Sequence, residues 1–264
     1  SEEILINVTP RETRAAVVEN GVLQEVQLER ALRRGYVGNI YKGRVSRVMP
    51  GMQAAFVEIG LERAAFLHAS DILRNVPPLA GDGQESAVTP PAQPIGELVR
   101  EGQEIVVQVI KDPIGSKGAR LTTNLSVPSR YLVLLPLAKA IGVSVRIEDE
   151  TERARLKEIL QARAQETGQG YIVRTNADGQ SAEALAEDVA YLTKLWQSVQ
   201  EAIARARAVD RVDEDLSLPL RALRDRMRKD IEKVRVDSRE TFDKVVKFVH
   251  KFMPQLDDRI EHYD

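Results

Sequence analysis

The stretch that decides the fold is NIYKGRVSRVMPGMQAAFVEIGLERAAFLHASDI, which runs from Asn39 to Ile72. Short apolar pieces of strand character are separated here by turn signals at Pro50-Gly51 and at Gly60. After a long interruption, two further strands are predicted at Glu104–Lys111 and Ala119–Thr123. Five short strands with one long loop are typical of a small Greek-key barrel.

The residue types on these strands suit single-stranded nucleic acid. Phe56 and Phe66 supply aromatic rings on which bases can stack, at about 1–3 kcal/mol for each base. Lys42 and Lys117 supply positive charge that can follow the phosphates. The alternative is that both phenylalanines belong to the barrel core. Strand alternation places Phe56 on the same face as Glu58, which favours exposure of Phe56 but leaves both interpretations open.

The barrel segment interrupts a second pattern that begins at the N-terminus. Ile4–Val8, Arg14–Val18 and Leu23–Leu28 are predicted strands, and Asn20-Gly21 is the signal of a tight hairpin. The apolar side of the third strand is formed by Leu23, Val26 and Leu28. So small a sheet needs a partner, and strand, helix and strand recur near the C-terminus, where Ser238 is placed to cap the helix. We expect these C-terminal elements to pack on the N-terminal meander, which gives one α/β domain split by two insertions.

Strands and helices alternate between the barrel and the C-terminal elements. Tyr131–Leu135 and Gly170–Thr175 are predicted strands, and a helix is expected over Glu148–Ala164. A longer helix is expected to begin after Ser181 as its N-cap and to run to about Ala206.

Arg174 and Thr175 end the strand GYIVRT and precede the turn NADG. A guanidinium offers a planar fork to two phosphate oxygens, and the threonine hydroxyl adds a donor beside it. A charge-assisted hydrogen bond contributes about 1.5–3 kcal/mol, so losing the fork would lower affinity on the order of tenfold to a hundredfold. The alternative is that Arg174 pairs with Asp178 or Glu183 while Thr175 serves the turn. On the residues alone, this second interpretation is the more ordinary one.

Composition excludes several classes of function. The net charge of −2 rules out a polycation that binds nucleic acid by charge alone. With no cysteine, the chain holds neither disulfides nor thiolate zinc sites, which fits a cytoplasmic protein. No apolar run reaches the roughly 18–20 residues of a membrane span, and His68, His250 and His262 are not spaced as metal ligands. The sequence displays no convergent set of carboxylates and no phosphate loop, so its residues alone do not indicate catalysis.

Several segments resemble the ribonuclease E/G family of bacterial endoribonucleases, and within it the ribonuclease G branch. They are NIYKGRVSRVMPGMQAAFVEIG, AAFLHASDI, KGARLTTNLSVPSRYLVLLP, IVRT and VRVDSRETF, and the resemblance runs from about Ile4 to Tyr263. It implies an α+β multidomain chain with an RNase H-like α/β domain in two segments, 1–37 and 209–264. Inserted into that domain are an S1-type OB-fold barrel that binds RNA, 38–124, and an α/β 5′-sensor domain, 125–208. A DNase I-like catalytic domain, a zinc link and a dimerisation domain follow in the family.

The resemblance also implies site residues. The barrel contacts to RNA fall on the residues already singled out: Phe56, Phe66 and Lys117, with Lys42 on an earlier strand. The 5′-monophosphate pocket falls on Arg174 and Thr175, with Val133 packing under the terminal base. Ser129 stands at a pocket position that is glycine in the ribonuclease E branch, and a second sensor arginine of the family aligns near Val145.

The parent enzyme implied by the resemblance cuts single-stranded, 5′-monophosphorylated RNA in the bacterial cytoplasm, in ribosomal RNA processing and mRNA decay. It uses Mg²⁺ and a structural Zn²⁺, whose ligands lie downstream, and it forms a homodimer or a higher oligomer. This chain alone is expected to bind RNA and to cut nothing. The alternatives are a non-catalytic OB-fold RNA-binding or scaffold module, and a structural oligomerisation fragment.

Overall fold

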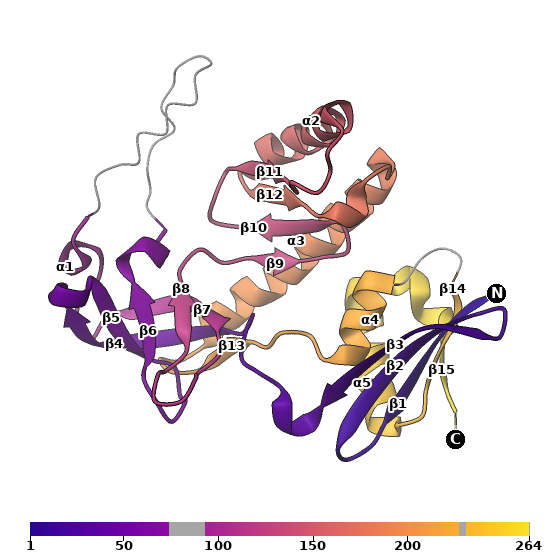
Figure 1. Ribbon diagram of the computed structural model, residues 1–264, viewed down its shortest axis with the longest axis horizontal. Coiled ribbons are helices and arrows are strands. Elements are labelled where there is room, and N and C mark those ends of the chain that lie inside the picture. The colour runs from indigo at the N-terminus through magenta and orange to yellow at the C-terminus, as the bar shows by residue number, and fades with distance from the viewer. Residues whose placement is uncertain (74–92, 227–230, 264) are drawn as a thin grey trace. The chain divides into compact units, whose positions relative to one another are not determined.

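The computed structural model describes residues 1–73, 93–226 and 231–263 (Figure 1). The Pro- and Gly-rich stretch 73–96, which the sequence predicts to be a surface loop, falls largely in residues 74–92, outside the described part. Contacts divide the chain into two compact units. The first comprises Ser1–Gly35, Val127–Ser198 and Asp215–Asp264, and the second comprises Tyr36–Ser126 and Val199–Glu214. The finer subdivision of the first unit into a split RNase H-like domain and a sensor domain stays a prediction.

The second unit is a β-barrel. Its strands hydrogen-bond in the order β4 (Ile40–Met49), β5 (Ala54–Glu58), β6 (Ala65–His68), β8 (Arg120–Thr122) and β7 (Glu104–Lys111). An antiparallel pairing of β4 with β7 closes the sheet on itself, and this closed five-stranded barrel confirms the prediction from the sequence. Short helical turns lie between the strands: η2 (Pro50–Met52), η3 (Ala69–Asp71) and α1 (Ile95–Leu98). A strand that the sequence did not predict, β13 (Arg211–Asp213), pairs antiparallel with the start of β4.

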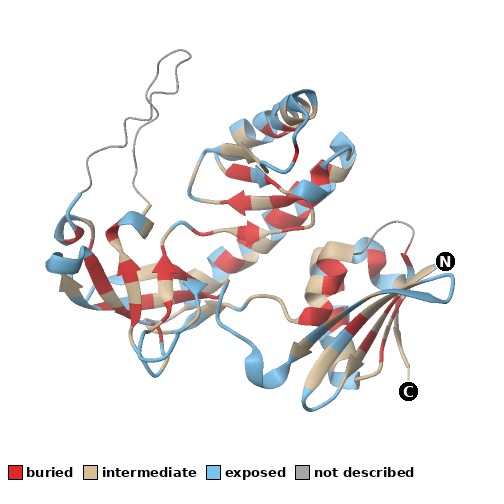
Figure 2. Cartoon of the chain, in the orientation of Figure 1, coloured by how far each residue is buried: buried red, intermediate tan, exposed pale blue. Residues whose placement is uncertain are grey.

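Strand alternation fills the barrel. Val57, Leu67 and Leu121 are fully buried members of its core, which also takes in residues of η3 and α1. The buried positions appear in red along β4 to β8 in Figure 2. Phe56 and Phe66, one position out of phase with that core, are only half-buried. The barrel therefore carries its two phenylalanines on the outer side of the sheet.

The larger sheet of the first unit joins the two ends of the chain. Its strand order is β15 (Ile260–His262), β14 (Ile231–Val236), β1 (Glu2–Val8), β2 (Glu12–Glu19) and β3 (Val22–Arg30). The first three strands of the chain form an antiparallel meander, with positive φ at Asn20 (49°) and Gly21 (80°) in the hairpin turn, and β14 pairs with β1 and β15 in parallel. Helices α4 (Leu218–Arg226) and α5 (Arg239–Phe252), the latter capped by Ser238, pack beside it. This arrangement confirms that the C-terminal elements pack on the N-terminal meander.

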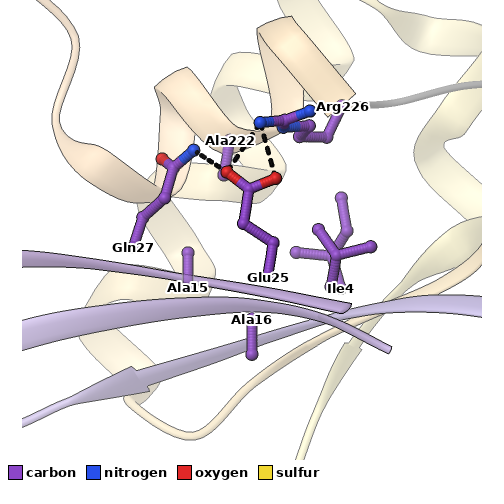
Figure 3. Close-up of a pocket in the computed structure, with 8 residues that line it drawn as sticks. Ile4, Ala15, Ala16, Glu25, Gln27, Ala222 and Arg226 are labelled. Carbon is purple, nitrogen blue, oxygen red and sulfur yellow. Dashed lines mark hydrogen bonds and ion pairs between the residues drawn. The ribbon is translucent and has the colours of Figure 1, made fainter. Parts of the chain in front are cut away.

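The side of β3 that meets α4 differs from expectation. Its apolar side chains are about half exposed: Leu23 at 57%, Val26 at 52% and Leu28 at 48%. The polar side faces α4 instead, where Glu25 accepts hydrogen bonds from Gln27 at 2.8 Å and from Arg226 at 2.6 Å (Figure 3). Strict alternation would place Leu23 on the opposite side from Val26 and Leu28, but a register shift between Leu23 and Glu25 brings it to their side. On the covered side, Arg221 and Arg226 of α4 pair with Glu29 and Glu25.

The smaller sheet of the first unit has the strand order β11 (Ile141–Val143), β12 (Gly170–Val173), β10 (Leu132–Leu135) and β9 (Val127–Pro128). β12 runs parallel to β11 and antiparallel to β10. Helix α2 (Glu150–Thr167) begins at the N-cap Asp149 and ends at Gly168, which has a φ of 69°. Helix α3 (Ala182–Arg205) begins where the Ser181 hydroxyl accepts a hydrogen bond from the Ala184 amide at 3.2 Å, as predicted. Further short turns are η1 (Ala31–Arg33), η4 (Thr175–Ala177) and η5 (Pro254–Arg259).

Candidate nucleic-acid interface

A row of four side chains crosses the outer face of the barrel. In the strand register Arg47 of β4 lies opposite Phe56 of β5, and Phe56 lies opposite Phe66 of β6. Phe66 in turn pairs with Arg120 of β8. Directly paired residues of neighbouring strands project from the same face. The row therefore places two aromatic rings between two guanidinium groups, the residue combination that stacks bases and neutralises phosphates.

The two phenylalanines form one aromatic surface. Their ring centroids are 6.2 Å apart with an interplanar angle of 69°, and both side chains lie outside the barrel core. His68, two residues beyond Phe66, lies with its ring centroid 6.4 Å from that of Phe66. The sequence pattern indicated only that His68 is not spaced as a metal ligand. Because His68 is two residues from Phe66 on one strand, the sequence alone could have shown that the two side chains share a face.

Lys117 and Lys42 differ in what surrounds them. Lys117 is exposed in the turn that precedes β8, and a Cβ added to the adjacent Gly118 would collide with the backbone carbonyl of Ala64. That close approach docks the turn against the loop before β6. Lys42 is half-buried, and its ammonium donates to the Ala206 carbonyl at 3.1 Å and lies 3.6 Å from the Glu104 carboxylate. Lys117 is thus presented to solvent, whereas Lys42 is committed to contacts within the unit.

Arg174 follows the last residue of β12 and is held by two acceptors. Its Nη1 donates to the Ser129 carbonyl, and it lies 3.4 Å from Oδ1 of Asp225. These partners differ from Asp178 and Glu183, which the sequence offered as alternatives. Asp225 also pairs through both of its oxygens with the buried Arg224, each at 2.9 Å. The Arg174 side chain is 32% exposed, so the guanidinium is oriented by the protein and still reaches solvent.

Hydroxyl groups from two parallel strands lie beside this arginine. Ser144 follows β11 and Thr175 follows β12, and their hydroxyl oxygens are 3.1 Å apart. Val145, near which the family resemblance places a second sensor arginine, is 86% exposed, and Arg146 is exposed beside it. The carboxyl ends of β11 and β12 therefore gather hydrogen-bond donors. Ser144 was not among the residues expected from the sequence.

Val133 lies on the solvent-facing side of the same sheet. It pairs directly with Ile172, which is 39% exposed, while the flanking residues Leu132 and Val173 are fully buried. Arg174 is two residues beyond Ile172 in extended backbone, with φ −81° and ψ 159°, so it projects from the same side. Val133 and Ile172 therefore form a part-exposed apolar surface, here called the apolar step, which ends at the Arg174 guanidinium.

Ser129 is fully buried, so its hydroxyl does not face solvent. The hydroxyl donates to the carboxylate of Asp188 on α3, which also accepts from the amides of Tyr131 at 2.8 Å and Leu132 at 3.1 Å. Burial raises the pKa of Asp188 above its ordinary value, and the hydrogen bonds from Ser129 and the backbone oppose that rise. The carbonyl of Ser129, not its side chain, is what reaches Arg174.

The loop after Arg174 is anchored to α2. Glu152 accepts two hydrogen bonds from Arg155, at 2.7 and 2.6 Å, and one from the Gly179 amide at 2.8 Å. These contacts, with Arg155 first, lower the pKa of Glu152 to about 2. Arg155 also donates to the Gln180 carbonyl at 2.8 Å. The Glu152–Arg155 ion pair thus holds the end of this loop, at Gly179 and Gln180.

Within residues 1–73, 93–226 and 231–263, no group of three or more His, Asp or Glu side chains is arranged to hold a metal ion. None of the helices in these ranges is both long and apolar enough to cross a lipid bilayer.

Comparison with known proteins agrees with the residue patterns. Residues 126–264 match the model of the Ribonuclease E/G family, and residues 36–112 match the S1 RNA binding domain. The chain is 51% identical to "Ribonuclease G" of Salmonella typhimurium and 50% identical to "Ribonuclease G" of Escherichia coli, each over 99% of this chain and 53% of the relative. "Ribonuclease E" of Haemophilus influenzae is 36% identical over 99% of this chain and 28% of its own length. The chain thus spans about half the length of the ribonuclease G relatives. Because the family model covers more than half of its residues, the chain belongs to the ribonuclease E/G family, and it contains an S1 RNA-binding domain.

Proposed function

We propose that this chain is the RNA-binding and 5′-monophosphate-sensing part of a ribonuclease G-like endoribonuclease. The observation that carries the sensing role is the group of donors at the carboxyl ends of β11 and β12. There an oriented, part-exposed guanidinium, that of Arg174, lies at the end of an apolar step formed by Val133 and Ile172. An anion on an apolar base is the ligand that such a surface fits.

In this proposal the barrel holds the body of the RNA. Bases stack on Phe56 and Phe66, at about 1–3 kcal/mol each, and Arg47 and Lys117 accompany the phosphates. Arg120 pairs with Phe66 in the strand register and already donates to the Asp71 carboxylate at 2.9 Å. Stacking on a ring and attraction to a phosphate are nearly independent of base identity, because every base has a π-face. The barrel therefore supplies affinity for single strands and little sequence preference.

The end of the strand is read by Arg174 and Thr175. The guanidinium fork binds two oxygens of the terminal phosphate, the Thr175 hydroxyl donates to a third position, and the first base packs on Val133. Asp225, 3.4 Å from Arg174, gives up that contact when the phosphate arrives. A 5′-hydroxyl offers no partner for the fork, and a triphosphate is too bulky for a hook that fits one phosphate.

The whole protein, in the same proposal, cuts single-stranded RNA in ribosomal RNA processing and mRNA decay in the bacterial cytoplasm, as a homodimer or higher oligomer. Its RNase H-like and 5′-sensor domains are the two sheets of the first unit. The Mg²⁺ that activates water and the structural Zn²⁺ belong to residues outside this chain. The described residues offer no fitting cluster of ligands for either ion, so no metal-dependent step is assigned to them.

The test compares two single-stranded RNAs of one sequence that differ only in a 5′-monophosphate or a 5′-hydroxyl. Both are titrated by fluorescence anisotropy at one fixed salt concentration, since phosphate contacts make affinity salt-dependent. Wild type should bind the phosphorylated RNA tighter by on the order of tenfold to a hundredfold, the worth of one charge-assisted fork. Arg174→Gln should lose this preference.

Arg163→Gln is the matched control, because Arg163 is an exposed arginine of α2 that pairs with Glu166 at 3.1 Å. It should leave both affinities unchanged. If wild type binds the two RNAs equally well, the sensing role is wrong, and the chain is an OB-fold RNA-binding or scaffold module. If the chain shows no salt-dependent RNA binding, both the sensing role and the RNA-binding module are wrong, and a structural role remains.

A further inference from the structure

The β9–β10 turn surrounds a carboxylate that comes from a distant part of the chain. Asp188 of α3 lies 56 to 59 positions downstream of the groups that it contacts. One of its oxygens, Oδ2, accepts from the Ser129 hydroxyl and from the amides of Tyr131 and Leu132. The Arg130 amide contributes as well. Successive backbone N–H groups that converge in this way form an anion-binding concavity, and here a side chain of the protein fills it.

The same turn holds Arg174 at two points. The Ser129 carbonyl accepts from the guanidinium, and the Tyr131 carbonyl accepts from the Arg174 amide at 2.8 Å. The N–H groups of Tyr131 and Leu132 are directed toward Asp188, and the carbonyl groups of Ser129 and Tyr131 are directed toward Arg174. The carboxylate and the guanidinium are thus linked through one short piece of backbone.

Holding a turn with a buried carboxylate carries a large desolvation cost. Asp188 is 9% exposed, and removing a charge from water costs several kcal/mol unless hydrogen bonds compensate. A neutral side chain could accept one or two of these hydrogen bonds at lower cost. A charged oxygen holds the turn in one geometry because all of its donors must point at a single atom.

We infer that Asp188 is a positioning residue for 5′-phosphate recognition, which fixes the Ser129–Leu132 turn so that the Arg174 guanidinium is aimed at the RNA end. This inference rests on the proposed function. Asp188 touches no RNA. It acts by limiting the orientations of Arg174, so its removal should affect binding of the phosphate and leave binding of the rest of the strand unchanged.

The test is Asp188→Asn in the same chain, with the neighbouring exposed Glu187→Gln as the matched control. The measured quantity is the ratio of affinities for matched RNAs with a 5′-monophosphate and a 5′-hydroxyl. We expect Asp188→Asn to reduce this ratio about three- to tenfold, the scale of one ordinary hydrogen bond, with affinity for 5′-hydroxyl RNA unchanged. Hydrogen exchange should show faster exchange of the Tyr131 and Leu132 amides.

A merely structural role predicts a different pattern, in which the melting temperature falls while the affinity ratio stays at the wild-type value. That result, or an equal loss for both RNAs, would overturn the inference. If Asp188→Asn does not fold, Ser129→Ala removes one donor and keeps the carboxylate, and it should lower the ratio about two- to threefold. An unchanged ratio in that variant would also overturn it. If wild type itself shows no preference, the proposed function fails, and this inference fails with it.

Discussion

Replacing Gly170 by alanine tests whether the start of β12 sets the position of its functional end. A Cβ at Gly170 would lie 2.5 Å from the Ala140 carbonyl oxygen, 2.8 Å from the Ala138 carbonyl oxygen and 3.0 Å from the Ala140 nitrogen. All three are backbone atoms, so no flexible side chain can move aside. The Ala140 carbonyl also accepts a hydrogen bond from the Tyr171 amide at 3.0 Å, which the new methyl group would disturb.

The expected cost follows from overpacking. Forcing a methyl group into a filled site costs about 1–3 kcal/mol. For a unit of this size, each kcal/mol lowers the melting temperature by about 2–4 °C. Gly170→Ala should therefore melt about 2–12 °C below wild type. It should also weaken the preference for 5′-monophosphorylated RNA, because Arg174 directly follows the last residue of the same strand.

Gly142→Ala is the control for this experiment. Gly142 lies in the neighbouring strand β11, and a Cβ there would meet only the Ile172 side chain, at an ordinary 3.8 Å. Thermal unfolding followed by circular dichroism, with anisotropy for RNA binding, gives both readouts. The reasoning is refuted if Gly170→Ala and Gly142→Ala melt together with wild type.

Three further outcomes are expected. Phe66→Ala should weaken binding of any single-stranded RNA by about 1–3 kcal/mol, and the 5′-end preference measured in the same titrations should stay intact. Glu152 has its folded pKa lowered to about 2 from 4.5, so its ion pair stabilises the fold above about pH 4.5 and is lost as the pH falls toward 2. Glu152→Gln should flatten melting temperature against pH in that window, and a curve parallel to wild type would contradict this. Asp225→Asn frees Arg174 from a partly exposed pair worth about 0.2–1 kcal/mol. Affinity for 5′-phosphorylated RNA should rise up to about fivefold in anisotropy titrations. The titrations are run well below the melting temperature, because Asp225 also pairs with the buried Arg224. A fall in affinity would contradict the idea that Arg174 leaves Asp225 to bind the phosphate.

The barrel was accessible from the sequence because its signals, short apolar strands separated by turn residues, are local. Alternation left open whether Phe56 and Phe66 belong to the barrel core, and in the structure both are half-buried and lie outside it. Alternation also did not show which residues of β3 share a face, because a register shift between Leu23 and Glu25 brings Leu23 to the side of Val26 and Leu28. It could not show which face α4 would cover, because that choice depends on arginines about 200 positions away, such as Arg226 opposite Glu25.

The groups that surround Arg174 could not be predicted from the sequence. Arg174 has charged neighbours close in sequence, yet its carboxylate partner is Asp225, 51 positions downstream. Asp188 likewise sits in the middle of a helix, where an acidic residue ordinarily faces water. β9 and β11 are two and three residues long, too short for any periodicity to reveal. Short strands and long-range ion pairs have no local pattern, so only the folded chain reveals them.

Strand β13 has a consequence for modularity. The chain leaves the barrel unit at Ser126 and re-enters it at Val199, and β13 then pairs with β4 before the chain departs again. The Lys42 amide donates to the Asp210 carbonyl at 3.0 Å, and the Lys42 carbonyl accepts from the Val209 amide at 2.6 Å. A barrel excised as 36–126 would lose both bonds and expose part of the edge of β4, which invites association with other chains. The smallest piece that keeps its RNA-binding barrel intact is therefore discontinuous, and any transplant of this module has to carry a second, distant segment with it.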